Sequence, residues 1–280
     1  MASSHEIAPV AIIFSLLQTI SLVALLAVLI PSILSKSVKR LATWYFFMFS
    51  WVAYTISFLL FSWRHRDYKP PLAGCFLQAI LIYAVPAASS TAGLCFVLEL
   101  YLHIRRSILG IGMSKWARTL LFAAPFCVLN FVIIFSFTMG ILHPSEIEMI
   151  EGAVYCHIRS ATPSLVTALI SFATNLTAII VLVIIAVMVY RPWKVVKSES
   201  VSLTPTITWS IVIRVSIFAC LPLIVLIVGL PLVFSTPDSA SSDRWTSLLA
   251  ILPLTVALIF GTQRDILSVY AFWRRREVKA

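Results

Sequence analysis

The chain has 280 residues, of which 60% are hydrophobic and 11% charged, and its formal net charge is +10. Soluble domains carry about 25% charged residues, so this composition excludes an ordinary soluble fold, and the charges are too few for a nucleic-acid-binding surface. Seven stretches lack Asp, Glu, Lys and Arg, and each is about as long as the roughly 20 apolar residues that cross a bilayer as a helix. A β-barrel is excluded because its strands alternate in polarity. We predict one all-α integral membrane domain over residues 1–280, a bundle of seven transmembrane helices.

In chain order, the expected spans are 8–34, 41–63, 72–104, 117–142, 164–190, 207–234 and 245–263, followed by a surface helix at 265–276. The first apolar run begins at Ile7 and is too long for a signal-peptide core, so it is interpreted as the first span. The second span is rich in aromatic residues, and the third combines Pro86 with small residues that let helices approach closely. Prolines inside several spans predict kinks, and Pro222 in the sixth is the expected hinge.

The surface helix is predicted from a change of pattern after Gly261. Ile266, Val269, Tyr270 and Trp273 recur at helical spacing and are followed by three arginines. A short helix with one apolar face and basic residues is typical of a segment that lies on the inner leaflet.

The basic residues predict the orientation of the bundle. If the N-terminus is outside, most of the 21 Lys and Arg residues fall in the inner loops and the tail, and most acidic residues fall outside. Because Lys and Arg concentrate on the cytoplasmic side, we predict an N-out, C-in topology. The expected location is the plasma membrane, which the chain crosses several times.

Ionisable residues inside the spans are scarce, which limits the possible chemistry. No histidine lies well inside a span, and residues 245–263 contain no lysine that a retinal Schiff base would need. We therefore expect no metal, no cofactor and no catalytic residues, and the protein is not expected to be an enzyme. Only Glu99 and Arg214 are charged candidates near the inner ends of spans. The neutral polar candidates at mid-depth include Gln78, Tyr83 and Asn175, for which helix–helix hydrogen bonding is the simpler interpretation.

Two cysteines are placed where they can pair. Cys75 lies at the expected outer end of the third span, and Cys156 lies in the long outer loop before the fifth. Because the outside is oxidising, we predict a Cys75–Cys156 disulfide that holds this loop over the mouth of the bundle.

Seven spans, an outer N-terminus, this cysteine pair and a basic surface helix together resemble a G-protein-coupled receptor. The chain more closely resembles the fungal lipopeptide mating-pheromone receptor family, the a-factor type. The resemblance rests on the order of short pieces along most of the chain: Cys75, Pro86-Ala87-Ala88, Leu94-Cys95, Leu100-Tyr101, Glu151-Gly152, Cys156, Pro163, Ser202-Leu203-Thr204, Arg214, Pro222, Arg244-Trp245, Phe260-Gly261 and Tyr270. It departs from the receptor pattern at Leu100, which follows Glu99 where an arginine is usual, and at Phe76, where the family has an acidic residue.

The resemblance implies an extracellular, prenylated-peptide-like ligand and a heterotrimeric G protein as partners, besides the lipid bilayer and without nucleic acid. Expected ligand contacts are Gln78, Tyr83, Asn175, Glu146, Glu148 and Glu151, the three acids being otherwise a solvated loop face. The expected G-protein face and switch comprise Glu99, Tyr101, Arg105, Arg106, Arg191, Lys194, Lys197, Arg214 and Arg264, whose basic members otherwise serve topology and lipid headgroups. We expect Glu99 to pair with Arg105, Arg106 or Arg214 in the resting state. The alternative function is a seven-helix transporter or lipid-handling membrane protein without receptor activity.

Overall fold

Long helices account for nearly all of the secondary structure. The computed structural model spans the chain, and the residues described are 7–35, 38, 40–62, 70–110, 112–149, 155–196, 213–217, 219–224, 227, 239–263 and 265–270. The helices are α1 (Ile7–Leu34), α2 (Ala42–Leu59), α3 (Leu72–Leu109), α4 (Lys115–Leu142), α5 (Ala161–Val196) and α7 (Ser239–Gly261). A shorter apolar helix covers Ile213–Ile224, and residues 265–270 are helical.

Five helical segments are long and apolar enough to cross a membrane: Ala11–Leu34, Ala42–Leu59, Leu72–Arg106, Lys115–Leu142 and Ala161–Val189. The all-α, membrane-type fold expected from composition is therefore confirmed at this level. Three helices extend well beyond the predicted spans, because α3 continues to Leu109, α5 continues to Val196 and α7 begins at Ser239. Hydropathy marks only the part of a helix that lies in lipid, and charged residues at its end do not unwind it. α3 stops at Gly110, whose φ of 71° gives the left-handed C-cap that glycine adopts readily.

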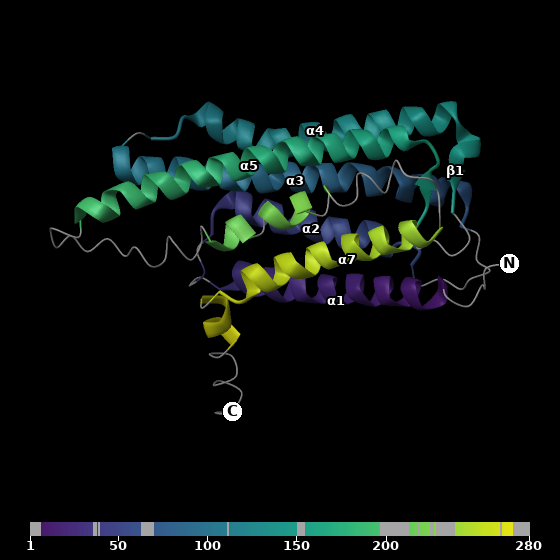
Figure 1. Cartoon of the computed structure of the whole chain (residues 1–280), viewed down its shortest axis with the longest axis horizontal. Helices are drawn as coiled ribbons and strands as arrows, with labels where there is room; N and C mark the ends of the chain where they lie inside the picture. The colour runs from purple at the N-terminus through teal and green to yellow at the C-terminus, as the bar shows by residue number, and fades with distance from the viewer. Residues whose placement is uncertain are drawn as a thin grey trace.

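α3 lies at the centre of the bundle and α4 and α5 at its surface. In the most apolar window of each helix, 78% of α3 is buried, against 22% for α4 and for α5. Figure 1 shows α3 between these two helices and α2, while α1 runs alongside α7. The exposed faces of α4 and α5 carry residues such as Phe131 and Ile180, as expected of surfaces that contact lipid.

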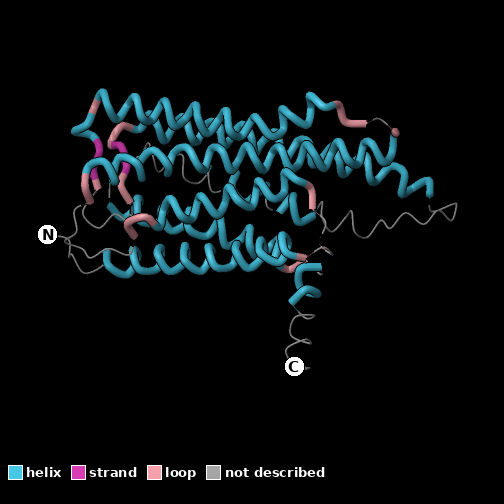
Figure 2. The backbone as a smooth tube through the Cα atoms, turned by 180° about the vertical axis from the view of Figure 1, so that it is seen from behind, coloured by secondary structure: helices cyan, strands magenta, loops and turns pink. Residues whose placement is uncertain are grey.

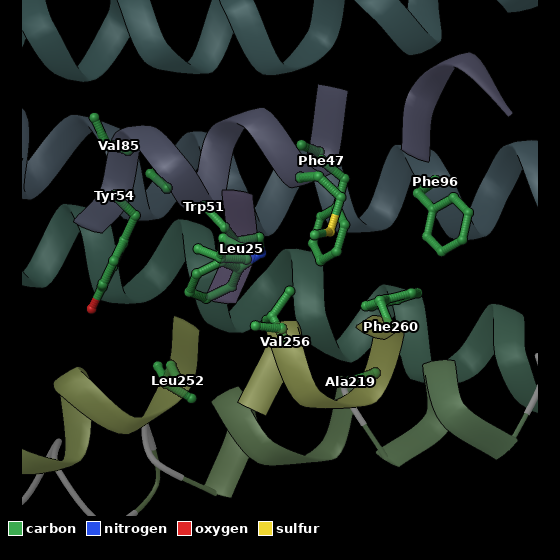
Figure 3. Packing of buried hydrophobic residues seen from close by; sticks show 14 of the residues in the cluster. Leu25, Phe47, Trp51, Tyr54, Val85, Phe96, Ala219, Leu252, Val256 and Phe260 are labelled. Carbon is green, nitrogen blue, oxygen red and sulfur yellow. The ribbon is translucent and has the colours of Figure 1, made fainter. Parts of the chain in front are cut away.

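The aromatic residues of α2 form the middle of the core. Trp44, Phe47, Trp51, Tyr54 and Phe58 are all buried and recur every three or four residues, so they share one face of the helix. Figure 3 shows Phe47 and Trp51 directed toward Val256 and Phe260 of α7, and Tyr54 toward the part of this helix that carries Leu252. The aromatic residues that enrich the second span therefore serve packing on this face of the helix.

Two tyrosines donate hydrogen bonds to backbone carbonyls that prolines leave without a helical partner. Proline has no N–H, so the carbonyl four residues before it loses its helical hydrogen bond. Pro253 frees the Leu249 carbonyl, and the Tyr54 hydroxyl donates to that oxygen at 3.2 Å. Pro31 frees the Ala27 carbonyl, and Tyr270 donates to that oxygen at 2.5 Å. Such replacement partners are what make prolines tolerable within membrane helices.

The surface helix is present over residues 265–270, where it turns away from the bundle axis beyond the end of α7 (Figure 1). Its apolar residues Ile266 and Val269 are buried in the protein, whereas we expected this face to lie on the leaflet. An ion pair between Asp265 and Arg40, with 2.5 Å between Oδ2 and Nη2, fixes its first turn against the loop before α2. Trp273 of the predicted apolar face lies outside the described residues.

Candidate functional site

One end of the bundle is covered by a small β-hairpin that we did not foresee. Strand β1 (Ile147–Glu148) pairs antiparallel with β2 (His157–Ile158), after the 3-10 turn η1 (Pro144–Glu146). Figure 2 shows these strands at the end where α1 begins. We call this the hairpin end. Two-residue strands give almost no hydropathy signal, which is why the sequence did not reveal them.

The predicted disulfide holds this hairpin to the bundle. Cys75 in the first turn of α3 is bonded to Cys156 next to β2, with an S–S distance of 2.03 Å and a sequence separation of 81. The expected pairing of Cys75 and Cys156 is thus present. Cys156 is completely buried, so the loop enters the end of the bundle.

Gln78 and Tyr83 reinforce this attachment. The Gln78 amide accepts a hydrogen bond from the Cys156 N–H at 3.0 Å and donates to the Ser57 carbonyl at 3.1 Å. The Tyr83 hydroxyl accepts from the Ile158 N–H at 3.1 Å and contacts the Ile158 carbonyl at 3.3 Å. The structure therefore gives both residues a role that the sequence did not suggest: they bind the backbone of the loop.

An aromatic cluster of Phe14, Tyr54, Phe58 and Tyr155 packs beneath the loop. The ring centroids of Phe14 and Phe58 are 5.8 Å apart, and those of Phe58 and Tyr155 are 5.2 Å apart. The cluster therefore joins α1, α2 and the loop through direct ring contacts. Asn175, a third expected ligand contact, is buried but donates to the Ser171 carbonyl of its own helix at 2.7 Å.

The three acidic residues that were expected to contact the ligand differ in their surroundings. Glu148 lies on β1 with its carboxylate 4.0 Å from Arg159, in a pair too exposed to stabilise the fold much. Glu146 lies in η1 with one buried carboxylate oxygen that has no hydrogen-bond partner, and Glu151 lies outside the described residues. Opposite Glu148, burial lowers the pKa of His157 below its usual value, while Glu148 raises it in part.

At the opposite end, Glu99 does not form the expected ion pair. Its side chain is 8% exposed, and its Oε2 accepts hydrogen bonds from the Thr43 hydroxyl and from the Thr43 N–H, the latter at 3.3 Å. The expected pairing with an arginine is wrong, since the ion pairs found among the described residues are Arg40–Asp265 and Arg159–Glu148. Thr43, at the start of α2, was absent from the candidate residues because nothing in its local sequence indicates a long-range partner.

Arg214 instead binds the end of α7. Its guanidinium donates to the Ile259 carbonyl at 2.6 Å, to the Thr262 hydroxyl at 2.7 Å and to the Thr262 carbonyl at 3.3 Å. The last four carbonyls of a helix lack partners within it, and a cation is favourable at this negative end of the helix dipole. Arg214 therefore connects the helix Ile213–Ile224 to α7, and Pro222 is buried further along that helix.

Basic residues surround this end, which we call the basic end: Arg40, Arg105, Arg106, Lys115 and Arg118. Arg106, Lys115 and Arg118 are exposed, Arg105 is half-buried, and Tyr101 packs on the core. Of the other expected members of the G-protein face, Arg191 and Lys194 belong to the last turns of α5. Lys197 and Arg264 lie outside the described residues. Among the residues that are described, no group of three or more His, Cys, Asp and Glu is arranged to hold a metal ion.

Sequence reasoning also missed the buried polar residue Gln18 of α1. It is completely buried, and neither polar atom of its amide has a hydrogen-bond partner. Its position on the apolar stripe of the first span, where a polar side chain is unexpected, would have identified it. A scan of the chain against protein-family models and a search of the curated proteins both find no match.

Proposed function

We propose that the protein is a seven-helix G-protein-coupled receptor of the plasma membrane, with its N-terminus outside, that binds an extracellular prenylated-peptide-like ligand. The observation that carries this proposal is the hairpin end. A disulfide-tethered loop bonded to Gln78 and Tyr83 closes one end of the bundle, where it can meet a ligand and pass its position to α1, α2 and α3. The resemblance to the fungal lipopeptide pheromone receptors supports the same conclusion.

In this proposal the ligand acts at the hairpin end and the G protein binds at the basic end. Glu146, Glu148 and Glu151 attract basic parts of the ligand, and the aromatic cluster offers apolar surface to its prenyl group. Binding shifts an equilibrium between two arrangements of the bundle. The helix Ile213–Ile224 swings outward about Pro222, and the cleft that opens is lined by the cationic side chains of the basic end.

The contacts of Arg214 define the resting state, in place of the ion pair first expected at Glu99. An outward swing of this helix has to break the bonds from Arg214 to Ile259 and Thr262. Replacing Arg214 therefore favours the open arrangement, and we expect Arg214→Gln to raise ligand-independent nucleotide exchange several-fold. The matched control is Arg159→Gln, which removes the same charge from an exposed position at the hairpin end, away from the proposed G-protein side.

The direct test is nucleotide exchange on a co-expressed Gα subunit while a panel of prenylated peptides is applied. Ligand-dependent exchange that requires the intact Cys75–Cys156 bond is the expected result. Absence of exchange with every peptide and Gα tested, together with measurable solute or lipid flux in vesicles, would refute the receptor proposal. It would favour the transporter or lipid-handling alternative.

A further inference from the structure

Gln18 lies on the inward face of α1. The buried positions of this helix include Phe14, Gln18, Ser21, Leu25 and Val28, spaced alternately by four and three residues, so they form one stripe. Phe14 is one helical turn closer to the hairpin end than Gln18, and its ring contacts Tyr155 of the loop at 6.3 Å between centroids. Gln18 therefore lies one helical turn further into the bundle than a member of the aromatic cluster.

Several buried polar side chains of α1 and α2 are already bonded to backbone carbonyls. The Ser21 hydroxyl donates to the Leu17 carbonyl at 2.6 Å, and Ser15 donates to the Ala11 carbonyl at 2.9 Å, both within α1. On α2, the Tyr54 hydroxyl donates to the Leu249 carbonyl. Gln18 has no partner for its Nε2 or its Oε1, although an amide offers two donors and an acceptor.

An unpartnered amide at zero exposure is unfavourable, because burial removes its hydrogen bonds with water and returns none. Native proteins leave few such groups, and each calls for a reason. A hydrophobic residue of the same size at position 18 would fill the space without this cost, as Leu25 does two turns further along α1.

We propose that Gln18 is a ligand-contacting residue, whose amide stays unpaired in the empty protein and pairs with a peptide amide of the bound ligand. A peptide group presents a donor and an acceptor together, which complements the two ends of the glutamine amide. A neutral partner is favoured because the buried stripe of α1 carries no charged side chain, and an unpaired charge there would be costly. This inference rests on the proposed function, since it names a contact of the same extracellular ligand.

The first experiment measures stability without ligand. Gln18→Leu removes an unsatisfied amide and is expected to raise the melting temperature in nanodiscs by about 2–5 °C. The matched control is Gln78→Leu. Gln78 is equally buried, but both ends of its amide are bonded, so its loss is expected to lower the melting temperature. A fall for Gln18→Leu as well would show that the Gln18 amide already has a partner, such as an ordered water, and would overturn the inference.

The second experiment measures binding of two probes that differ in one amide. N-acetyl-S-farnesylcysteine methyl ester contains the prenyl group and an amide, whereas methyl 3-(farnesylthio)propanoate has the prenyl group and the ester alone. The wild type is expected to bind the amide probe about ten-fold more tightly, and Gln18→Leu is expected to bind the two probes equally. An unchanged preference in Gln18→Leu would overturn the inference.

Failure of the inference and failure of the proposed function give different results. If the wild type binds both probes and signals, but Gln18→Leu keeps the preference for the amide, then the receptor stands and Gln18 is not a ligand contact. If the wild type binds neither probe, the prenylated ligand class is refuted, and with it the peptide amide assigned to Gln18. The melting temperature of Gln18→Leu then still decides whether its amide is unpaired.

Discussion

The bond between Tyr54 and the Leu249 carbonyl makes a quantitative prediction about how this bundle tolerates Pro253. The Tyr54 side chain is 2% exposed, and its hydroxyl is 3.2 Å from the oxygen that Pro253 deprives of a helical partner. Tyr54→Phe keeps the ring and removes the hydroxyl, so the carbonyl is left without a partner in a dry interior. Leaving a buried acceptor unsatisfied costs about 1–3 kcal/mol, while hydrogen bonds between membrane helices reach at most about 1.7 kcal/mol. We therefore expect a loss of about 1–1.5 kcal/mol.

The same substitution in a Pro253→Ala background isolates the cause. Alanine at 253 restores an N–H four residues after Leu249, so the carbonyl regains a helical partner and the tyrosine hydroxyl becomes dispensable. Tyr54→Phe is then expected to cost less than about 0.5 kcal/mol, which gives a coupling energy of about 1 kcal/mol between the two positions. The measurement is thermal unfolding in nanodiscs of the four proteins of this double-mutant cycle: the wild type, the two single variants and the double variant. Tyr54→Phe alone is expected to lower the melting temperature by about 2–3 °C. An equal loss in both backgrounds would refute the reasoning.

A second cycle at Tyr270 and Pro31 provides a matched comparison. Tyr270 makes the same kind of bond to the Ala27 carbonyl, but its side chain is 41% exposed. Water or lipid headgroups can replace its hydroxyl, so the coupling energy of Tyr270→Phe with Pro31→Ala is expected to be below about 0.5 kcal/mol. A coupling as large as that of Tyr54 would show that burial is not what sets the magnitude.

Three further predictions concern the hairpin end and the contact between α3 and α4. Cys75→Ser opens a loop of 81 positions, for which chain entropy gives an upper limit of about 4.5 kcal/mol, so its melting temperature should fall; equal melting of the oxidised wild type and the variant would contradict this. Gly140→Ala places a Cβ 2.1 Å from the Phe76 ring and should lower the free energy of unfolding by about 1–3 kcal/mol. The loss should be smaller in a Phe76→Leu background, and additive losses from the two substitutions would contradict the assigned clash. Burial lowers the pKa of His157, so the unfolded chain binds a proton more readily than the folded protein. The contribution of His157 to the free energy of unfolding is therefore constant above about pH 6.5 and declines below it. The loss of stability between pH 8 and pH 5 should be smaller in His157→Gln, and identical pH profiles of the two proteins would refute this prediction.

The substitution Glu99→Gln shows how the structure changes an expectation. With an arginine as its partner, loss of the Glu99 charge would release a resting-state ion pair. Its described partner is Thr43, and a glutamine amide oxygen still accepts hydrogen bonds from the Thr43 hydroxyl and N–H. The contact of α2 with α3 is therefore expected to persist in Glu99→Gln, and the larger effect on basal exchange moves to Arg214.

Composition and spacing determined the class of this protein and several local features. Apolar runs predict membrane helices because the bilayer penalises unpaired backbone and charge along the whole run. The Cys75–Cys156 pair followed from the location of each cysteine, and Ile266 with Val269 followed from helical spacing. Each of these predictions depends on where a residue lies relative to the apolar runs, which can be read from the sequence without knowing how the helices pack.

Only the tertiary structure decided which polar groups meet. The partners of Glu99, Arg214, Gln78 and Tyr54 all come from other elements of the chain, and each contact depends on the depth and rotation of the helices that carry it. A hydrogen bond tolerates a change of only a few tenths of an ångström in its donor–acceptor distance. A shift of one residue along a helix rotates the side chain by about 100° around the helix axis. For the same reason, the sequence identifies Gln18 as one glutamine in an apolar span, and only the packed bundle shows that its amide is unpaired.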